Sequence, residues 1–180
     1  MLRNWLMVMA LLVSTGPGFS AQTAVSKEYQ VKAVFLFNFA QFVQWPSDTF
    51  ATADKPFLIG ILGDDPFDDF LDDTVRGEKV DGHPLIIRRY EHLEEARDCQ
   101  ILFISRSQYK RIENILASLK GRNILTVGDT DGFTRDGGIV GFFMERNKVH
   151  FKINVEAAKR GRLSISSKVL RLASIDQGGN

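Results

Sequence analysis

The stretch KEYQVKAVFLFNFAQFVQWP (27–46) decides how the rest of the chain must be arranged. Ser26 precedes it and is a favourable N-cap residue, and Glu28 lies in the first turn, where the helix dipole favours an acid. Pro46 cannot continue a helix and holds the residue before it in extended geometry. The sequence therefore predicts a helix that begins after Ser26 and ends before Pro46.

Apolar side chains cover most of the circumference of this helix. The polar ones share one narrow stripe at helical spacing, formed by Lys27, Gln30, Asn38 and Gln41. Such a helix must be buried on more than one side. It is either the central packing helix of the domain or a helix that also meets a partner, and core packing is favoured because buried helices are commoner.

The first 21 residues have the organisation of a secretory signal peptide. Arg3 supplies a positive start, residues 5–13 form an apolar run too short to span a bilayer comfortably, and a Gly-Pro-Gly sequence precedes small residues. We expect cleavage after Ser20 or Ala21, with a retained anchor as the alternative, and a single exported domain over residues 22–180. The protein is therefore expected in the periplasm.

Composition excludes some classes of protein. The 23 Lys and Arg residues nearly balance the 22 Asp and Glu residues, so no basic excess indicates a nucleic-acid partner. The one cysteine, Cys99, cannot form an intrachain disulfide, so the domain must be stable through its core. The 14 Phe residues are compatible with a homodimer.

Apolar runs at 57–62, 101–104 and 124–127 are typical of strands buried on both faces in a parallel sheet. A further strand is expected at 85–89, and segments with helical spacing separate the strands. One of these helices is expected to begin at Asp65, as N-cap, with Pro66 at its first position. The alternation predicts an α/β three-layer sandwich with a mainly parallel sheet.

The C-terminal part breaks this alternation. The polar turn at 145–148 joins two strands, which predicts an antiparallel hairpin and hence a partly mixed sheet. Asn154 is expected to cap a helix over 155–160. Ser166 or Ser167 should open a last helix, with an apolar face of Val169, Leu170, Leu172 and Ala173.

Ligands of open α/β sheets bind at the carboxyl ends of the strands. The polar residues expected there, Asp64, Ser105 and Asp129, are candidates for a ligand crevice. No nucleophile elbow, Walker loop or dinucleotide fingerprint is present, and the three histidines lack metal-ligand spacing. The sequence therefore indicates no enzyme, no cofactor and no metal site.

Five stretches resemble the YfiR family of exported bacterial regulators, and together they cover nearly the whole mature chain in order. They are residues 32–46 (KAVFLFNFAQFVQWP), 58–67 (LIGILGDDPF), 99–105 (CQILFIS), 124–133 (ILTVGDTDGF) and 137–173, which begins GGIVGFFMERNKVHF.

The resemblance implies a periplasmic α/β domain without catalytic activity, which represses an inner-membrane diguanylate cyclase by contacting its periplasmic part. Release by an outer-membrane lipoprotein and control of cyclic-di-GMP output, hence biofilm formation, are implied as well. Disulfide-based redox control is not, because only Cys99 is present.

Two hypotheses follow. In the first, the protein is an adaptor, and aromatic side chains near the end of the first helix anchor the partner. The residues expected to bind the partner are Phe42, Val43 and Trp45, with the C-terminal cations Arg160 and Arg162. In the second, the domain senses a small periplasmic ligand in the strand-end crevice and acts on a membrane sensor kinase.

Overall fold

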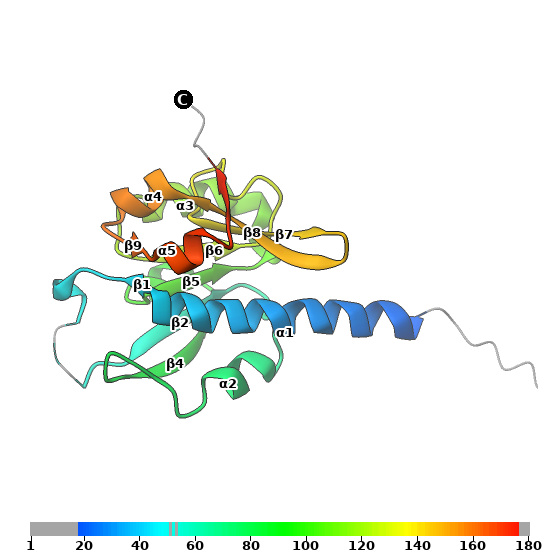
Figure 1. Ribbon diagram of the computed structural model, residues 1–180, viewed down its shortest axis with the longest axis horizontal. Helices are drawn as coiled ribbons and strands as arrows, with labels where there is room; N and C mark the ends of the chain where they lie inside the picture. The colour runs from blue at the N-terminus through cyan, green and yellow to red at the C-terminus, as the bar shows by residue number, and fades with distance from the viewer. Residues whose placement is uncertain (1–17, 51, 53, 177–180) are drawn as a thin grey trace, which may run out of the picture.

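The computed structural model describes residues 18–176 except 51 and 53. Its main sheet has the strand order β10-β8-β7-β6-β5-β2-β4-β3, and β1 and β9 form a separate antiparallel pair (Figure 1). The strands are β1 (Val43–Gln44), β2 (Phe57–Leu62), β3 (Lys79–Val80), β4 (His83–Tyr90), β5 (Ile101–Ile104), β6 (Leu125–Gly128), β7 (Val140–Glu145), β8 (Lys148–Asn154), β9 (Ser164–Ile165) and β10 (Ser174–Asp176).

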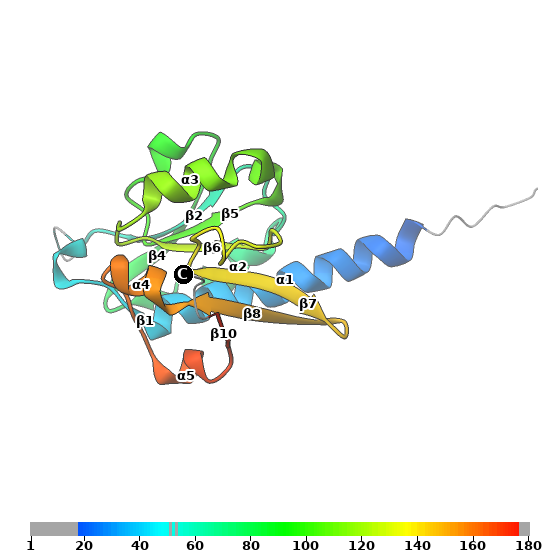
Figure 2. The ribbon, with the colours of Figure 1, turned by 90° about the horizontal axis from the view of Figure 1, so that it is seen from above.

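The helices connect and cover these strands. They are α1 (Gly18–Phe42), α2 (Phe70–Val75), α3 (Ile112–Leu119), α4 (Val155–Arg160) and α5 (Ser167–Leu170), with the 3-10 helices η1 (Ser47–Thr49), η2 (Leu93–Ala96) and η3 (Arg106–Arg111). The N-terminal turns of α1 and the β7–β8 hairpin extend to the same side of the molecule (Figures 1 and 2).

Most of the sheet is parallel, which confirms the predicted fold class. The pairs β4–β2, β2–β5, β5–β6 and β6–β7 are parallel, whereas β7–β8 and β3–β4 are antiparallel. The hairpin turn places Arg146 and Asn147 at φ 50° and 60°, the left-handed pair of a tight two-residue turn.

Successive residues of the buried strands pack into two separate cores, because side chains alternate between the faces of a sheet. On one face, Ile59 and Phe103 pack with residues of α1, α2, α4 and α5. On the other face, Leu58 and Leu102 pack with α3 and η2. The sheet therefore has helices on both sides, α1 and α3 on opposite faces (Figure 2), in the expected three layers.

The first helix has different limits from those predicted. It begins at Gly18, so Ser26 is not its N-cap, and Glu28 instead forms an i,i+4 ion pair with Lys32. It ends at Phe42 because Val43 pairs with Ile165 of β9 and takes the chain into extended geometry ahead of Pro46. Of the segment expected to be a signal peptide, residues 1–17 lie outside the described residues.

The helix expected at Asp65 begins later. Asp65 accepts a hydrogen bond from the backbone N–H of Phe67 (2.8 Å) in a tight turn, and Asp68 has a left-handed φ of 49° that interrupts helical geometry. The N-cap of α2 is therefore Asp69.

The C-terminal helices largely match their prediction. Asn154 caps α4 by accepting from the N–H of Ala157 (2.9 Å), and Ser166 precedes α5. Leu172, expected on the apolar face of the last helix, lies beyond its end and is 69% exposed. The chain then forms β10, parallel to β8, which the sequence did not predict.

Candidate functional site

The carboxyl ends of β2, β5 and β6 lie at one edge of the sheet and carry the three residues expected to form a ligand crevice. Asp64 follows β2, Ser105 follows β5 and Asp129 follows β6. Asp64 is exposed, whereas Ser105 and Asp129 are buried. The structure therefore places them at the predicted edge but in different environments.

Side chains of α1 donate hydrogen bonds to the carboxylate of Asp129. Its Oδ2 accepts hydrogen bonds from the hydroxyl of Tyr29 (2.7 Å) and from Nζ of Lys32 (2.6 Å). The ammonium also lies 4.2 Å from the centre of the Tyr29 ring. The carboxylate of Asp129 is thus already bound by side chains of the protein itself.

Two further charges complete this cluster. Arg106 donates from Nε to the backbone carbonyl of Asp129 (3.2 Å) and lies 3.3 Å from its Oδ2, and Glu28 pairs with Lys32. Two cations thus balance two carboxylates, which a buried ionic group requires. Burial, followed by the hydrogen bond to Asp129, raises the pKa of Tyr29 above its ordinary value.

The neighbouring strand ends are tied together by hydroxyl groups. Ser107 accepts a hydrogen bond from the backbone N–H of Asp64 (2.9 Å), and Ser105 accepts from the N–H of Ser107 (3.4 Å) as the N-cap of η3. A Cβ at Gly63 would lie 2.8 Å from Nε2 of Gln108, so these loops are in close contact. The loop after β2, which contains Asp64, is therefore packed against the loop after β5, which contains Ser105.

Sequence reasoning missed the role of Lys32. Lys32 occurs in an apolar run and does not belong to the polar stripe of α1. A charged residue on the buried side of a helix indicates a buried ion partner, and this was the available signal. Its partner Asp129 is 97 residues away in sequence, so no local pattern connects the two.

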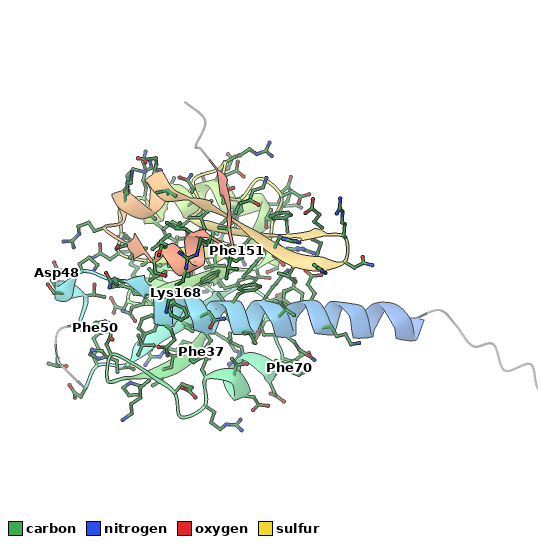
Figure 3. The ribbon with its side chains drawn as sticks, viewed as in Figure 1. Phe37, Asp48, Phe50, Phe70, Phe151 and Lys168 are labelled. Carbon is green, nitrogen blue, oxygen red and sulfur yellow. The ribbon has the colours of Figure 1, made fainter. Side chains whose placement is uncertain are left out.

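A second region gathers the residues expected to bind a partner. The pairing of β1 with β9 brings Val43 opposite Ile165, three residues after Arg162. Lys168 of α5 lies near the C-terminal end of α1 (Figure 3). Its Nζ is 5.3 Å from the ring centre of Phe42. The sheet pairing thus unites the aromatic and cationic segments that the sequence separates by about 120 positions.

These expected partner residues differ in accessibility. Phe42 is 37% exposed, and Arg160 and Arg162 are exposed. Val43 is buried, and the ring of Trp45 packs edge-on against Phe57 with centroids 4.9 Å apart. Phe42 and the two arginines therefore provide most of the accessible surface of this group.

The outer side of α1, called the α1 stripe below, exposes three apolar side chains among polar ones. Val31, Val34 and Phe42 are 44%, 49% and 37% exposed, and Lys27 and Gln41 on the same side are exposed as well. Beside it, a groove of about 610 Å³ lies between α1 and the β7–β8 hairpin, with Phe35, Met144 and Val149 in its wall. The opposite side of α1 is buried in the core through Leu36, Phe39 and Ala40.

Within residues 18–176, apart from 51 and 53, no helix is long and apolar enough to cross a membrane. In the same part of the chain, no group of three or more His, Cys, Asp or Glu side chains is arranged to hold a metal ion.

Comparison with known proteins gives one family. A search of curated proteins found no match. The family model described as YfiR/HmsC-like matches residues 29–174, which include α1 from Tyr29 onward and every strand of the main sheet up to the start of β10. The chain therefore belongs to the YfiR/HmsC-like family, and this membership supports a periplasmic regulator of cyclic-di-GMP signalling in general.

Proposed function

We propose that this protein is a non-enzymatic periplasmic regulator that binds the periplasmic part of an inner-membrane diguanylate cyclase and represses it. Family membership supports the kind of pathway and the kind of partner. The observation that carries the contact surface is the outer stripe of α1, where the apolar side chains of Val31, Val34 and Phe42 are each more than a third exposed.

The stripe suits a protein partner because apolar and aromatic side chains provide most of the binding energy at an interface. Lys168, which lies 5.3 Å from the ring centre of Phe42, would contribute a cation to a polar rim. A regulator that binds one state of a membrane sensor more tightly shifts its equilibrium by the ratio of the two affinities. Repression then needs no chemical step by the regulator.

The test uses the full chain with the periplasmic part of the cyclase encoded with it. Val34→Gln and Phe42→Ala should weaken capture of that part and raise cellular cyclic-di-GMP. Tyr109→Ala is the matched control, because Tyr109 is a 64% exposed aromatic residue of η3 that is not part of the α1 stripe. All proteins should be compared at equal folded concentration.

If both stripe variants capture the partner and repress as well as the unchanged protein, the stripe is not the contact surface. If the protein instead captures a sensor kinase and leaves cyclic-di-GMP unchanged, the cyclase is the wrong partner. Sequencing the N-terminus of the exported protein tests the expected cleavage after Ser20 or Ala21.

A further inference from the structure

A polar crevice of about 390 Å³ lies at the amino ends of β2, β5 and β6, the edge of the sheet opposite the Asp129 cluster. The segments before these strands supply its wall, together with η1 and Arg162, which follows α4. Its charged residues are Lys55, Arg97, Arg122 and Arg162, against Asp48 and Asp98.

The crevice has an excess of positive charge that the whole chain lacks. Four cationic side chains face two carboxylates there, whereas the formal net charge of the protein is +1. Arg162 pairs with Asp48 at 3.3 Å. Across the described part of the chain, neither Arg97 nor Arg122 forms an ion pair, so these two guanidinium groups keep their donors for another acceptor.

Arg162 is held in place in this crevice. Its backbone has a left-handed φ of 54°, which a non-glycine residue adopts at a cost. The side-chain oxygen of Asn123 accepts a hydrogen bond from Nε of Arg162 (3.3 Å). The cation is therefore positioned rather than left free in solvent.

We propose that this crevice binds a small phosphate-bearing anion. Guanidinium groups bind phosphate oxygens through paired N–H donors, and Arg97 and Arg122 have those donors available. A volume of about 390 Å³ is within the range of small-molecule sites. The phosphate belongs either to a soluble phosphate ester or to a phospholipid headgroup at the membrane surface.

The binding test measures the melting temperature and calorimetric binding of the exported chain with inorganic phosphate, glycerol 3-phosphate and sodium chloride at matched ionic strength. Sedimentation with vesicles of phosphatidylglycerol, against phosphatidylcholine, covers the lipid source. We expect phosphate or the ester to raise the melting temperature more than chloride does. Binding to phosphatidylglycerol vesicles without a soluble-phosphate effect would also support the site and assign the lipid source.

The double variant Arg97→Gln/Arg122→Gln should weaken that binding at least tenfold. Lys110→Gln/Arg111→Gln is the control, because it removes the same charge from exposed residues of η3, at the other edge of the sheet. If both double variants lose phosphate binding equally, the effect comes from net charge alone and the proposal is overturned. The absence of any phosphate or headgroup effect beyond that of chloride would also overturn it. Cyclase capture by the α1 stripe does not involve Arg97 or Arg122, so the two proposals fail independently.

Discussion

The ammonium nitrogen of Lys32 lies 2.6 Å from Oδ2 of Asp129, and each side chain is 1% exposed. This contact joins the middle of α1 to the carboxyl end of β6. A charge pair this deeply buried is balanced by its own geometry, so removing one partner leaves the other buried charge with only one ion partner, Arg106 for Asp129 or Glu28 for Lys32. The position of α1 on the sheet therefore depends on this pair as well as on the apolar core.

Lys32→Met should lower the free energy of unfolding by about 3–5 kcal/mol, because it leaves the Asp129 carboxylate buried without its ammonium. Urea unfolding monitored by circular dichroism measures the loss. Lys152→Met removes an exposed lysine and should change stability by less than about 0.5 kcal/mol. A loss below about 1 kcal/mol for Lys32→Met would show that the pair is dispensable.

Tyr29 should make stability depend on alkaline pH. Its pKa is raised in the folded state, first by burial and then by the hydrogen bond to Asp129. The neutral phenol is therefore favoured by folding, and its contribution is complete below the unfolded pKa of 10.0 and is lost as pH rises beyond it. Comparing the unfolding free energy of the unchanged protein and Tyr29→Phe between pH 8 and about pH 11 isolates this contribution.

The difference between these two proteins should shrink as pH rises above about 10, because ionisation removes the advantage that the hydroxyl group provides. Near neutral pH, Tyr29→Phe should cost about 1.5–3 kcal/mol, the range for a hydrogen bond to a charged acceptor. A difference that stays constant over the whole pH range would contradict the coupling between Tyr29 and Asp129.

The sequence predicted the layers better than the contacts between them. The apolar runs that became β2, β5 and β6 identified the parallel sheet, since strands buried on both faces have no alternation of polar residues. The turn at 145–148 identified the hairpin, and Asn154 identified the start of α4. Each of these signals lies within a few consecutive residues.

The contacts that the sequence did not reveal connect distant segments. The role of Lys32 depends on Asp129, and the end of α1 depends on the pairing of Val43 with Ile165. Local propensity favoured a helix up to Pro46, but sheet pairing ended it at Phe42. The crevice of cations at the amino edge likewise draws its residues from segments more than a hundred positions apart, between Asp48 and Arg162.

Trp45 and Phe42 should respond differently to truncation. The Trp45 ring packs edge-on against the fully buried Phe57, so Trp45→Ala should lose about 2–4 kcal/mol of stability. Phe42 is 37% exposed, and Phe42→Ala should lose less than about 1.5 kcal/mol. Urea titration of both variants checks the order, and Trp45→Phe, which keeps an aromatic ring, should fall between the unchanged protein and Trp45→Ala.

This order decides how partner-binding data are interpreted. A failure of Trp45→Ala to bind a partner has a structural explanation through Phe57, whereas a failure of folded Phe42→Ala does not. If Trp45→Ala is as stable as the unchanged protein, the indole is not part of the core and its predicted role as an anchor gains support.

Cys99 should be chemically inert in the folded protein. Burial raises the pKa of its thiol to about 12, and the Sγ–H donates to the carbonyl of Ala96 (2.8 Å). Thiolate is the reactive form, so a disulfide-exchange reagent at pH 8 should react with the native chain far more slowly than with the chain in urea. Rapid, complete reaction of the native protein would show that the segment around Cys99 opens readily.

Gly128 is expected to tolerate no side chain, because it lies directly against the ring of Phe133. A Cβ at this position would stand 2.5 Å from Cδ2 and 2.9 Å from Cζ of that ring, and Phe133 is 1% exposed in a filled core. Gly128→Ala should therefore cost about 1–3 kcal/mol through overpacking, measured by urea unfolding. Asn114→Ala, at an exposed position of α3, is the control and should change stability by less than about 0.5 kcal/mol. Phe133→Leu leaves room for the new methyl group, so the double variant should be more stable than the sum of the two single losses predicts, and strict additivity would refute the contact.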